Sequence, residues 1–79
     1  MPATEAPREV TKTVTVELPA DRTEDYNLGL FLNGRAVLEN TVISAGTQSI
    51  GVTLTGSGTV YYDLYINDAY YKTVKVVFS

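Results

Sequence analysis

The sequence predicts an all-β domain made of antiparallel strands. Apolar residues alternate with polar ones at a period of two in several segments, which is the pattern of strands with one buried face. Thr, Val and Tyr, which favour strands, dominate the chain, and no segment repeats apolar residues at the spacing of three and four that is typical of a helix. Short turn sequences separate the segments, so strands that follow one another are expected to be antiparallel neighbours.

A first strand is expected at residues 10–18, where Lys12 alone interrupts the apolar face. Pro19 ends this strand, because proline cannot donate a hydrogen bond to a β-ladder, and the polar loop A-D-R-T-E-D follows. The apolar residues of the strand are Val10, Val14, Val16 and Leu18, and they alternate with Thr11, Thr13, Thr15 and Glu17.

A hairpin is expected around Asn33 and Gly34. Asn-Gly between two apolar runs is typical of a type I′ turn, since both residues tolerate the positive φ that this turn requires. After the turn, R-A-V-L-E-N is predicted as one short strand and T-V-I-S-A-G as a second, which ends at Gly46. Before the turn, Leu28, Leu30 and Leu32 alternate with Gly29 and Phe31.

The next strand, S-I-G-V-T-L-T, places Ile50, Val52 and Leu54 in phase, and Gly56, Ser57 and Gly58 form the turn after it. With the hairpin that follows, the chain has about seven strands in about 70 residues, which is the layout of an antiparallel β-sandwich. A small barrel of the SH3 or OB type is the alternative on the same strand count.

The last hairpin holds five of the six tyrosines, and its register is in question. A two-residue turn at Asn67 and Asp68 pairs Tyr65 with Tyr70 and Asp63 with Lys72, but it leaves Val74, Val76 and Phe78 on the face opposite the core residues Val60, Leu64 and Ile66. A β-bulge near Lys72 and Thr73 would restore the phase. The alternative is a three-residue loop, Asn67 to Ala69, which we disfavour because such a loop usually needs glycine where Ala69 stands.

The candidate binding surface is a strip of outward tyrosines on this hairpin. If Val60, Leu64 and Ile66 face the core, Tyr61 and Tyr65 point to solvent, and one of Tyr70 and Tyr71 should join them. A tyrosine ring has an apolar face and a polar rim, which suits it to stacking on sugars or to a protein interface. The competing interpretation is that these rings only pair across the ladder and shield its hydrogen bonds.

Composition excludes several kinds of function. The chain has no Cys and no His, so it can use neither a cysteine nucleophile nor histidine acid–base chemistry, and we expect no enzyme and no cofactor. The net charge is −3 and the basic residues are scattered, so nucleic acid is not an expected partner, and no apolar run is long enough to insert into a membrane. The acidic loop at Asp21, Glu24 and Asp25 lacks the spacing of a calcium loop, so no metal is expected there.

The domain is predicted at residues 10–79. Residues 1–9 are rich in Ala, Pro, Glu and Thr without periodicity, and we expect a disordered linker or leader there. We also expect the domain to belong to a larger protein, whose other domains would be its first partners.

The pattern resembles the immunoglobulin-like and fibronectin-III-like accessory modules of bacterial cell-surface and secreted proteins. The segments that carry this resemblance are V-T-K-T-V-T-V-E-L, G-S-G-T-V-Y-Y-D-L-Y-I-N and V-K-V-V-F, within residues 10–79. The paired cysteines and core tryptophan of antibody domains are absent, which favours a bacterial type. The resemblance implies an extracellular or cell-surface location and a role as spacer or protein-docking domain. The first alternative is a carbohydrate-binding module that uses the tyrosines. The second is a self-assembling pilus-like or phage structural domain that pairs through an exposed strand edge.

Overall fold

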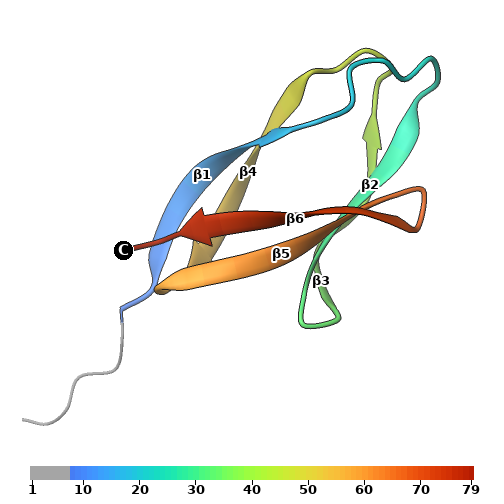
Figure 1. Ribbon diagram of the computed structural model, residues 1–79. Coiled ribbons are helices and arrows are strands. Elements are labelled where there is room, and N and C mark those ends of the chain that lie inside the picture. Colours follow the sequence, from blue (N-terminus) through green and yellow to red (C-terminus); the bar gives the residue numbers. More distant parts are fainter. Residues whose placement is uncertain (1–7) are drawn as a thin grey trace, which may run out of the picture.

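The chain folds into β-strands only. The computed structural model describes residues 8–79, and these form six strands and no helix (Figure 1). Most of the predicted linker, residues 1–9, lies outside the described residues, whereas Arg8 and Glu9 are exposed and lead directly into the first strand. The strands are β1 (Val10–Glu17), β2 (Tyr26–Leu32), β3 (Arg35–Ile43), β4 (Ser49–Gly56), β5 (Thr59–Ile66) and β6 (Ala69–Val77).

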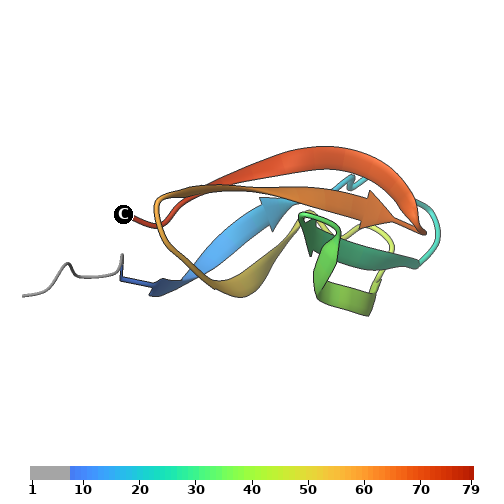
Figure 2. The same ribbon diagram turned by 90° about the horizontal axis from the view of Figure 1, so that it is seen from below.

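The strands form two antiparallel sheets. β1 pairs with β4, and the larger sheet has the order β3-β2-β5-β6. Figure 2 shows β5 and β6 as the upper layer with β1 and β4 below them. Within residues 8–79 no strand of one sheet is paired with a strand of the other, so the chain does not close into the barrel that was the alternative. Buried apolar residues of both sheets meet in one core: Val16, Leu18, Tyr26, Leu28, Leu30, Ile43, Val52, Leu54, Tyr62, Leu64, Ile66, Val76 and Phe78.

The predicted count of about seven strands is wrong because β3 runs without a break through residues 35–43. Two short strands, R-A-V-L-E-N and T-V-I-S-A-G, were expected in this part of the chain. Asn40 has a φ of 52°, and the chain absorbs this left-handed residue as a bulge without leaving the sheet. Leu28 of β2 faces Thr41 while Leu30 faces Leu38, so β3 carries an extra residue there, and a second irregularity follows Leu30.

Both predicted two-residue turns are present. Asn33 and Gly34 have φ values of 52° and 82°, and Asn67 and Asp68 have values of 50° and 65°, as a type I′ turn requires. The second turn is also tied to β2, since Asn67 donates its N–H to the carbonyl oxygen of Asn27 at 2.9 Å. In return, the side-chain oxygen of Asn67 accepts the N–H of Asn27 at 3.0 Å.

The last hairpin contains a bulge, one residue nearer the turn than predicted. Tyr65 faces Tyr70, but Leu64 faces Lys72, so the extra residue is Tyr71 and the bulge does not lie at Lys72 and Thr73. The three-residue loop is therefore wrong, and so is the pairing of Asp63 with Lys72, because Asp63 faces Thr73. Beyond the bulge, Val76 and Phe78 are buried, and Val60 and Val74 are half-buried against the core.

Lys12 explains how β1 can carry a charge in phase with its apolar residues. Its ammonium nitrogen donates a hydrogen bond of 2.9 Å to the carbonyl oxygen of Val77 on β6. The amine thus reaches out of the space between the sheets, while its stem covers the side where β1 and β6 approach. β1 therefore keeps its predicted buried face despite this residue.

Tyr26 is the sixth tyrosine, and it is a core residue. Its side chain is 3% exposed, and its buried hydroxyl has no hydrogen-bond partner in the described part of the chain. Burial raises the pKa of this hydroxyl, while the charge of Arg22, whose Cζ lies 5.4 Å from the ring centroid, lowers the pKa and Tyr71 raises it. Burial also raises the pKa of Tyr62.

Replacement of Tyr26 by Phe tests this buried hydroxyl. The folded state holds the Tyr26 proton more tightly than the unfolded chain does, so this stabilisation is complete below pH about 10 and is lost as pH rises through the folded pKa. Tyr26→Phe should reduce that alkaline loss of stability, with Tyr62 supplying the rest. At pH 7 the variant should match the wild type or exceed it by up to about 1 kcal/mol, because an unpaired buried hydroxyl is costly. Urea unfolding at pH 7 and above pH about 10 measures the effect. A large loss in the free energy of unfolding of Tyr26→Phe at pH 7 would show that the hydroxyl stabilises the fold.

Gly56 is required by the ring of Phe78. A Cβ at Gly56 would lie 2.6 Å from Cε2 of the buried Phe78 ring, whereas a Cβ at Gly51 would meet only the Thr13 methyl group, at 3.3 Å. Gly56→Ala should therefore lower the free energy of unfolding by about 1–3 kcal/mol, and Gly51→Ala by much less. Adding Phe78→Leu to Gly56→Ala should cost less than Phe78→Leu costs in the wild type. Additive losses in the double variant would show that the two residues do not clash.

Candidate functional site

The candidate site lies on the outer face of the larger sheet, where β5 is a central strand. Tyr61, Asp63 and Tyr65 point outward from β5, because the residues between them, Tyr62 and Leu64, are buried on the inner face. On the neighbouring strands, Phe31 faces Asp63, and Tyr70 faces Tyr65. Three strands thus bring aromatic and acidic side chains to one face.

Three aromatic rings form a row across these strands, and we call Phe31, Tyr65 and Tyr70 the aromatic row. The Phe31 and Tyr65 centroids lie 5.1 Å apart with 69° between the ring planes, and the Tyr65 and Tyr70 centroids lie 6.0 Å apart at 79°. Gly29 makes room for the first ring, since a Cβ there would lie 2.9 Å from Cε1 of Phe31. The rings meet edge to face, which is a favoured arrangement, so they do not form a flat platform.

A short chain of hydrogen bonds holds the polar side of the site. The Thr73 hydroxyl donates to Oδ1 of Asp63 at 3.3 Å, and it lies 2.7 Å from the hydroxyl of Tyr70. Because the Thr73 proton goes to Asp63, Thr73 accepts the proton of Tyr70. The Asp63 carboxylate is therefore fixed by its cross-strand neighbour and keeps its second oxygen for a ligand.

An open recess of about 340 Å³ lies beside the aromatic row. Phe31, Asp63 and Tyr65 line it, together with Gly34 and Asp68 from the two turns. Ring surfaces and two carboxylates thus meet in one hollow. Such a hollow suits a group that has both an apolar part and a positive charge, or one that carries hydroxyl groups.

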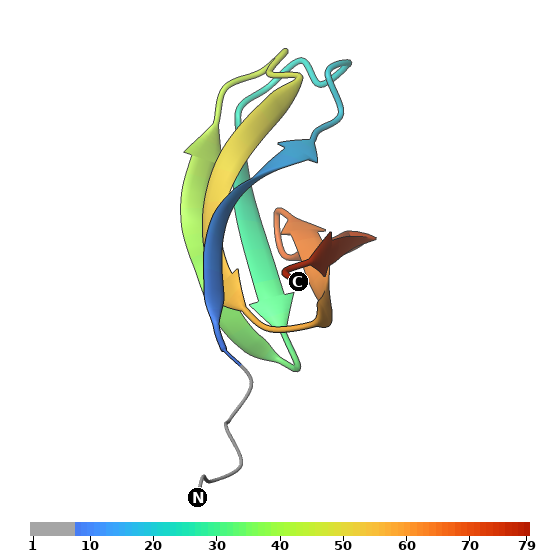
Figure 3. The same ribbon diagram turned by 90° about the vertical axis from the view of Figure 1, so that its left-hand side faces the viewer.

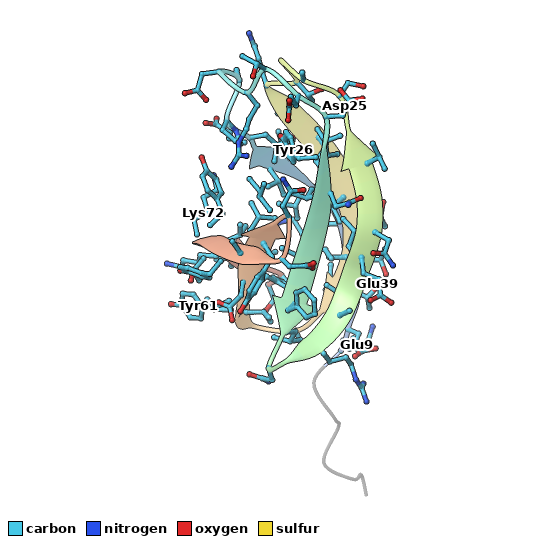
Figure 4. The ribbon with its side chains drawn as sticks, turned by 90° about the vertical axis from the view of Figure 1, so that its right-hand side faces the viewer. Glu9, Asp25, Tyr26, Glu39, Tyr61 and Lys72 are labelled. Atoms are coloured by element: carbon cyan, nitrogen blue, oxygen red, sulfur yellow. The ribbon has the colours of Figure 1, made fainter. Side chains whose placement is uncertain are left out.

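The four predicted site residues do not lie together. Tyr70 joins Tyr65 in the aromatic row, with Tyr70 57% exposed and Tyr65 half-buried between its neighbours. Tyr61 is 58% exposed but faces Lys75 and lines a different hollow. Tyr71, the extra residue of the bulge, has its ring centroid 5.6 Å from the Lys72 nitrogen. Figure 4 shows Tyr61 and Lys72 on the side formed by β5 and β6, away from Glu39 on β3.

Sequence reasoning missed Phe31, Asp63, Asp68 and Thr73. The signal for Phe31 was present, because an aromatic residue alternated with the buried leucines and so had to point outward. The pairing of β2 with β5, which brings Phe31 to Asp63, is a contact between strands that do not follow one another in the chain. Local patterns carry no information on such a pairing.

The acidic loop has a structural use. Oδ1 of Asp25 accepts the N–H of Ala45 at 2.9 Å, which ties the loop after β1 to the connection between β3 and β4. Asp21 and Glu24 are exposed. In residues 8–79 no three acidic side chains are grouped closely enough to hold a metal ion.

Comparison with protein-family models, with curated proteins and with solved structures finds no match to this chain. Residues 8–79 include no helix long and apolar enough to cross a membrane. The function must therefore be inferred from the geometry and chemistry of the recess and of the sheet edges.

A double-mutant cycle tests the aromatic row. Tyr65→Leu and Tyr70→Leu should show a coupling of about 0.5–1 kcal/mol in the free energy of unfolding, because their rings meet edge to face across the ladder. Tyr61→Leu is the matched control, and its effect should add to that of Tyr65→Leu within about 0.5 kcal/mol. Equal coupling in both cycles would show that the row has no special stability.

Proposed function

We propose that this chain is a non-catalytic binding domain that docks a protein partner through the recess on its outer face. One observation supports this proposal above all. The same recess is lined by two aromatic rings and two carboxylates, those of Phe31, Tyr65, Asp63 and Asp68. A lysine or arginine side chain suits this combination, because its stem packs on aromatic rings while its charge pairs with a carboxylate. The partner is therefore a protein segment that presents a basic side chain.

The proposed architecture is an immunoglobulin-like sandwich. The order β3-β2-β5-β6 corresponds to the C′-C-F-G sheet of such domains, and β1 with β4 corresponds to strands B and E. The core between the sheets and the short turns support this assignment. In that architecture, the outer face of the C′-C-F-G sheet is open to a partner, as it is here.

The positions of the first and last strands favour docking over an in-line spacer. Lys12 near the start of β1 contacts Val77 at the end of β6, and Phe78 donates its N–H to the carbonyl oxygen of Gly58 beside the same end of the fold. Figure 1 shows both ends of the described chain on one side. Domains attached before β1 and after β6 would therefore meet at one end of this domain, which would project from them. We place such a projecting domain in a bacterial cell-surface or secreted protein.

Carbohydrate binding is the second candidate. It is favoured by the exposure of Tyr61 and Tyr70, which are 58% and 57% exposed. Against it, the rings of the aromatic row stand at 69° and 79° to one another, so a flat polysaccharide chain would find no continuous platform. A single sugar ring stacked on one tyrosine is the form that this candidate takes.

The two candidates are separated by titration of the labelled protein in NMR. Short peptides with a central lysine or arginine should shift the amide signals of Phe31, Asp63 and Tyr65, and peptides with glutamine instead should not. Asp63→Asn should weaken this binding about two- to fivefold, the loss expected for an exposed cation contact. Asp21→Asn removes the same charge from a residue that does not line the recess and should have no effect.

The other results of the titration are equally informative. If only cell-wall and plant polysaccharides shift the amide signals, the result would favour sugar binding over protein docking. An unchanged response of Asp63→Asn, or no shift with any ligand at millimolar concentration, would contradict a role for the recess.

A further inference from the structure

The free edge of β4 borders a second hollow of the molecule. β4 pairs with β1 along one edge, and in the described residues its other edge is unpaired. A groove of about 340 Å³ is lined there by residues 50–53 of β4 and by Val37, Leu38, Thr41 and Ile43 of β3. Figure 3 shows β4 (yellow) between β1 (blue) and β3 (green). The groove thus lies on the side of the fold away from the contact between Lys12 and Val77.

The groove runs along the edge of β4 and not over one of its faces. Successive side chains of a strand point to opposite faces, yet four consecutive residues of β4 line this groove. Ile50 and Val52 approach it from the core side, whereas Thr53 is on the exposed side. A strand laid beside β4 would therefore both extend the small sheet and fill the groove.

The other three sheet edges carry features that oppose strand addition. β1 has Lys12, whose amine is bonded to β6 beside this edge, β3 has two bulges, and β6 has the bulge at Tyr71 followed by Lys72 and Lys75. β4 has no charge, no proline and no bulge in its pairing with β1. It is the strand that is least protected against pairing with another strand.

The chemistry around β4 indicates what covers it. No charged residue occurs in residues 40–62, although 19% of the whole chain is charged. A strand that covers this edge should itself be uncharged and rich in strand-forming residues, and β4, with the sequence SIGVTLTG, has both properties. A second copy of the chain supplies such a strand.

We propose that two copies of this chain pair through β4, antiparallel about a two-fold axis. The two small sheets then become one sheet of order β1-β4-β4-β1, and each groove is covered at the interface. The outward residues of β4 are Ser49, Gly51, Thr53 and Thr55, which are small and uncharged, so no like charges oppose each other in the new ladder. The exposed side of Val37, 41% accessible in one copy, would be buried with the groove.

The chain offers a matched pair of variants for this dimer. Thr13 on β1 faces Thr53 on β4, and their hydroxyl groups lie 3.2 Å apart. Thr13→Lys and Thr53→Lys both remove this hydrogen bond and both add one charge to the same exposed face. Only Thr53→Lys puts like charges on the two strands that meet at the two-fold axis.

Sedimentation equilibrium of the full chain from micromolar to about 1 mM measures the association. The wild type and Thr13→Lys should dimerise equally, and Thr53→Lys should lower the association constant at least about threefold. In amide hydrogen exchange, β4 amides that do not donate to β1 should gain protection only at concentrations at which the dimer forms. Urea unfolding checks that both variants are folded to the same extent.

A wild type that stays monomeric at about 1 mM would overturn the dimer, and so would equal weakening by the two variants. Protection that appears on β1, β3 or β6 instead of β4 would show that a different edge is used, which also overturns it. The recess and the β4 groove share no lining residue, so the dimer does not depend on the recess and Asp63→Asn should leave the association constant unchanged. Failure of peptide binding and failure of dimerisation are therefore distinguishable.

Discussion

The extra residue at Tyr71 is the constraint on which the larger sheet depends. The turn at Asn67 and Asp68 fixes how β6 starts, and without a bulge this start would turn Val76 and Phe78 to solvent. Each of these side chains contributes roughly 1.5–3 kcal/mol when buried, more than the cost of one irregular ladder position. The bulge therefore satisfies both the turn and the core.

The same bulge divides the tyrosines into two groups. Tyr70 lies before it and faces Tyr65 on the outer side, where it completes the aromatic row and supports Asp63 through Thr73. Tyr71 lies at the bulge, where its electrostatic interaction with Tyr26 raises the pKa of Tyr26 in addition to the larger effect of burial. Core packing and the composition of the recess are thus consequences of one backbone irregularity.

Much of the fold could be predicted from sequence because alternation and turn residues are local signals. These signals predicted the all-β class, the first strand from Val10 and both two-residue turns. The strand count failed at Asn40, since a left-handed residue can either end a strand or form a bulge, and its own neighbours do not decide between these. For the site, Tyr65 and Tyr70 could be foreseen, but Phe31 and Asp63 meet only through the pairing of β2 with β5.

The pairing of β1 with β4 has a consequence for how the protein folds. The hairpins β2-β3 and β5-β6 join strands that follow one another, but Val10 of β1 faces Gly56 at the far end of β4. During synthesis from the N-terminus, β1 therefore leaves the ribosome long before its partner exists. Contacts so distant in sequence close slowly, because loop entropy must be lost before they form. β1 therefore stays unpaired until β4 has been made, and its pairing, like that of β2 with β5, forms more slowly than the two hairpins.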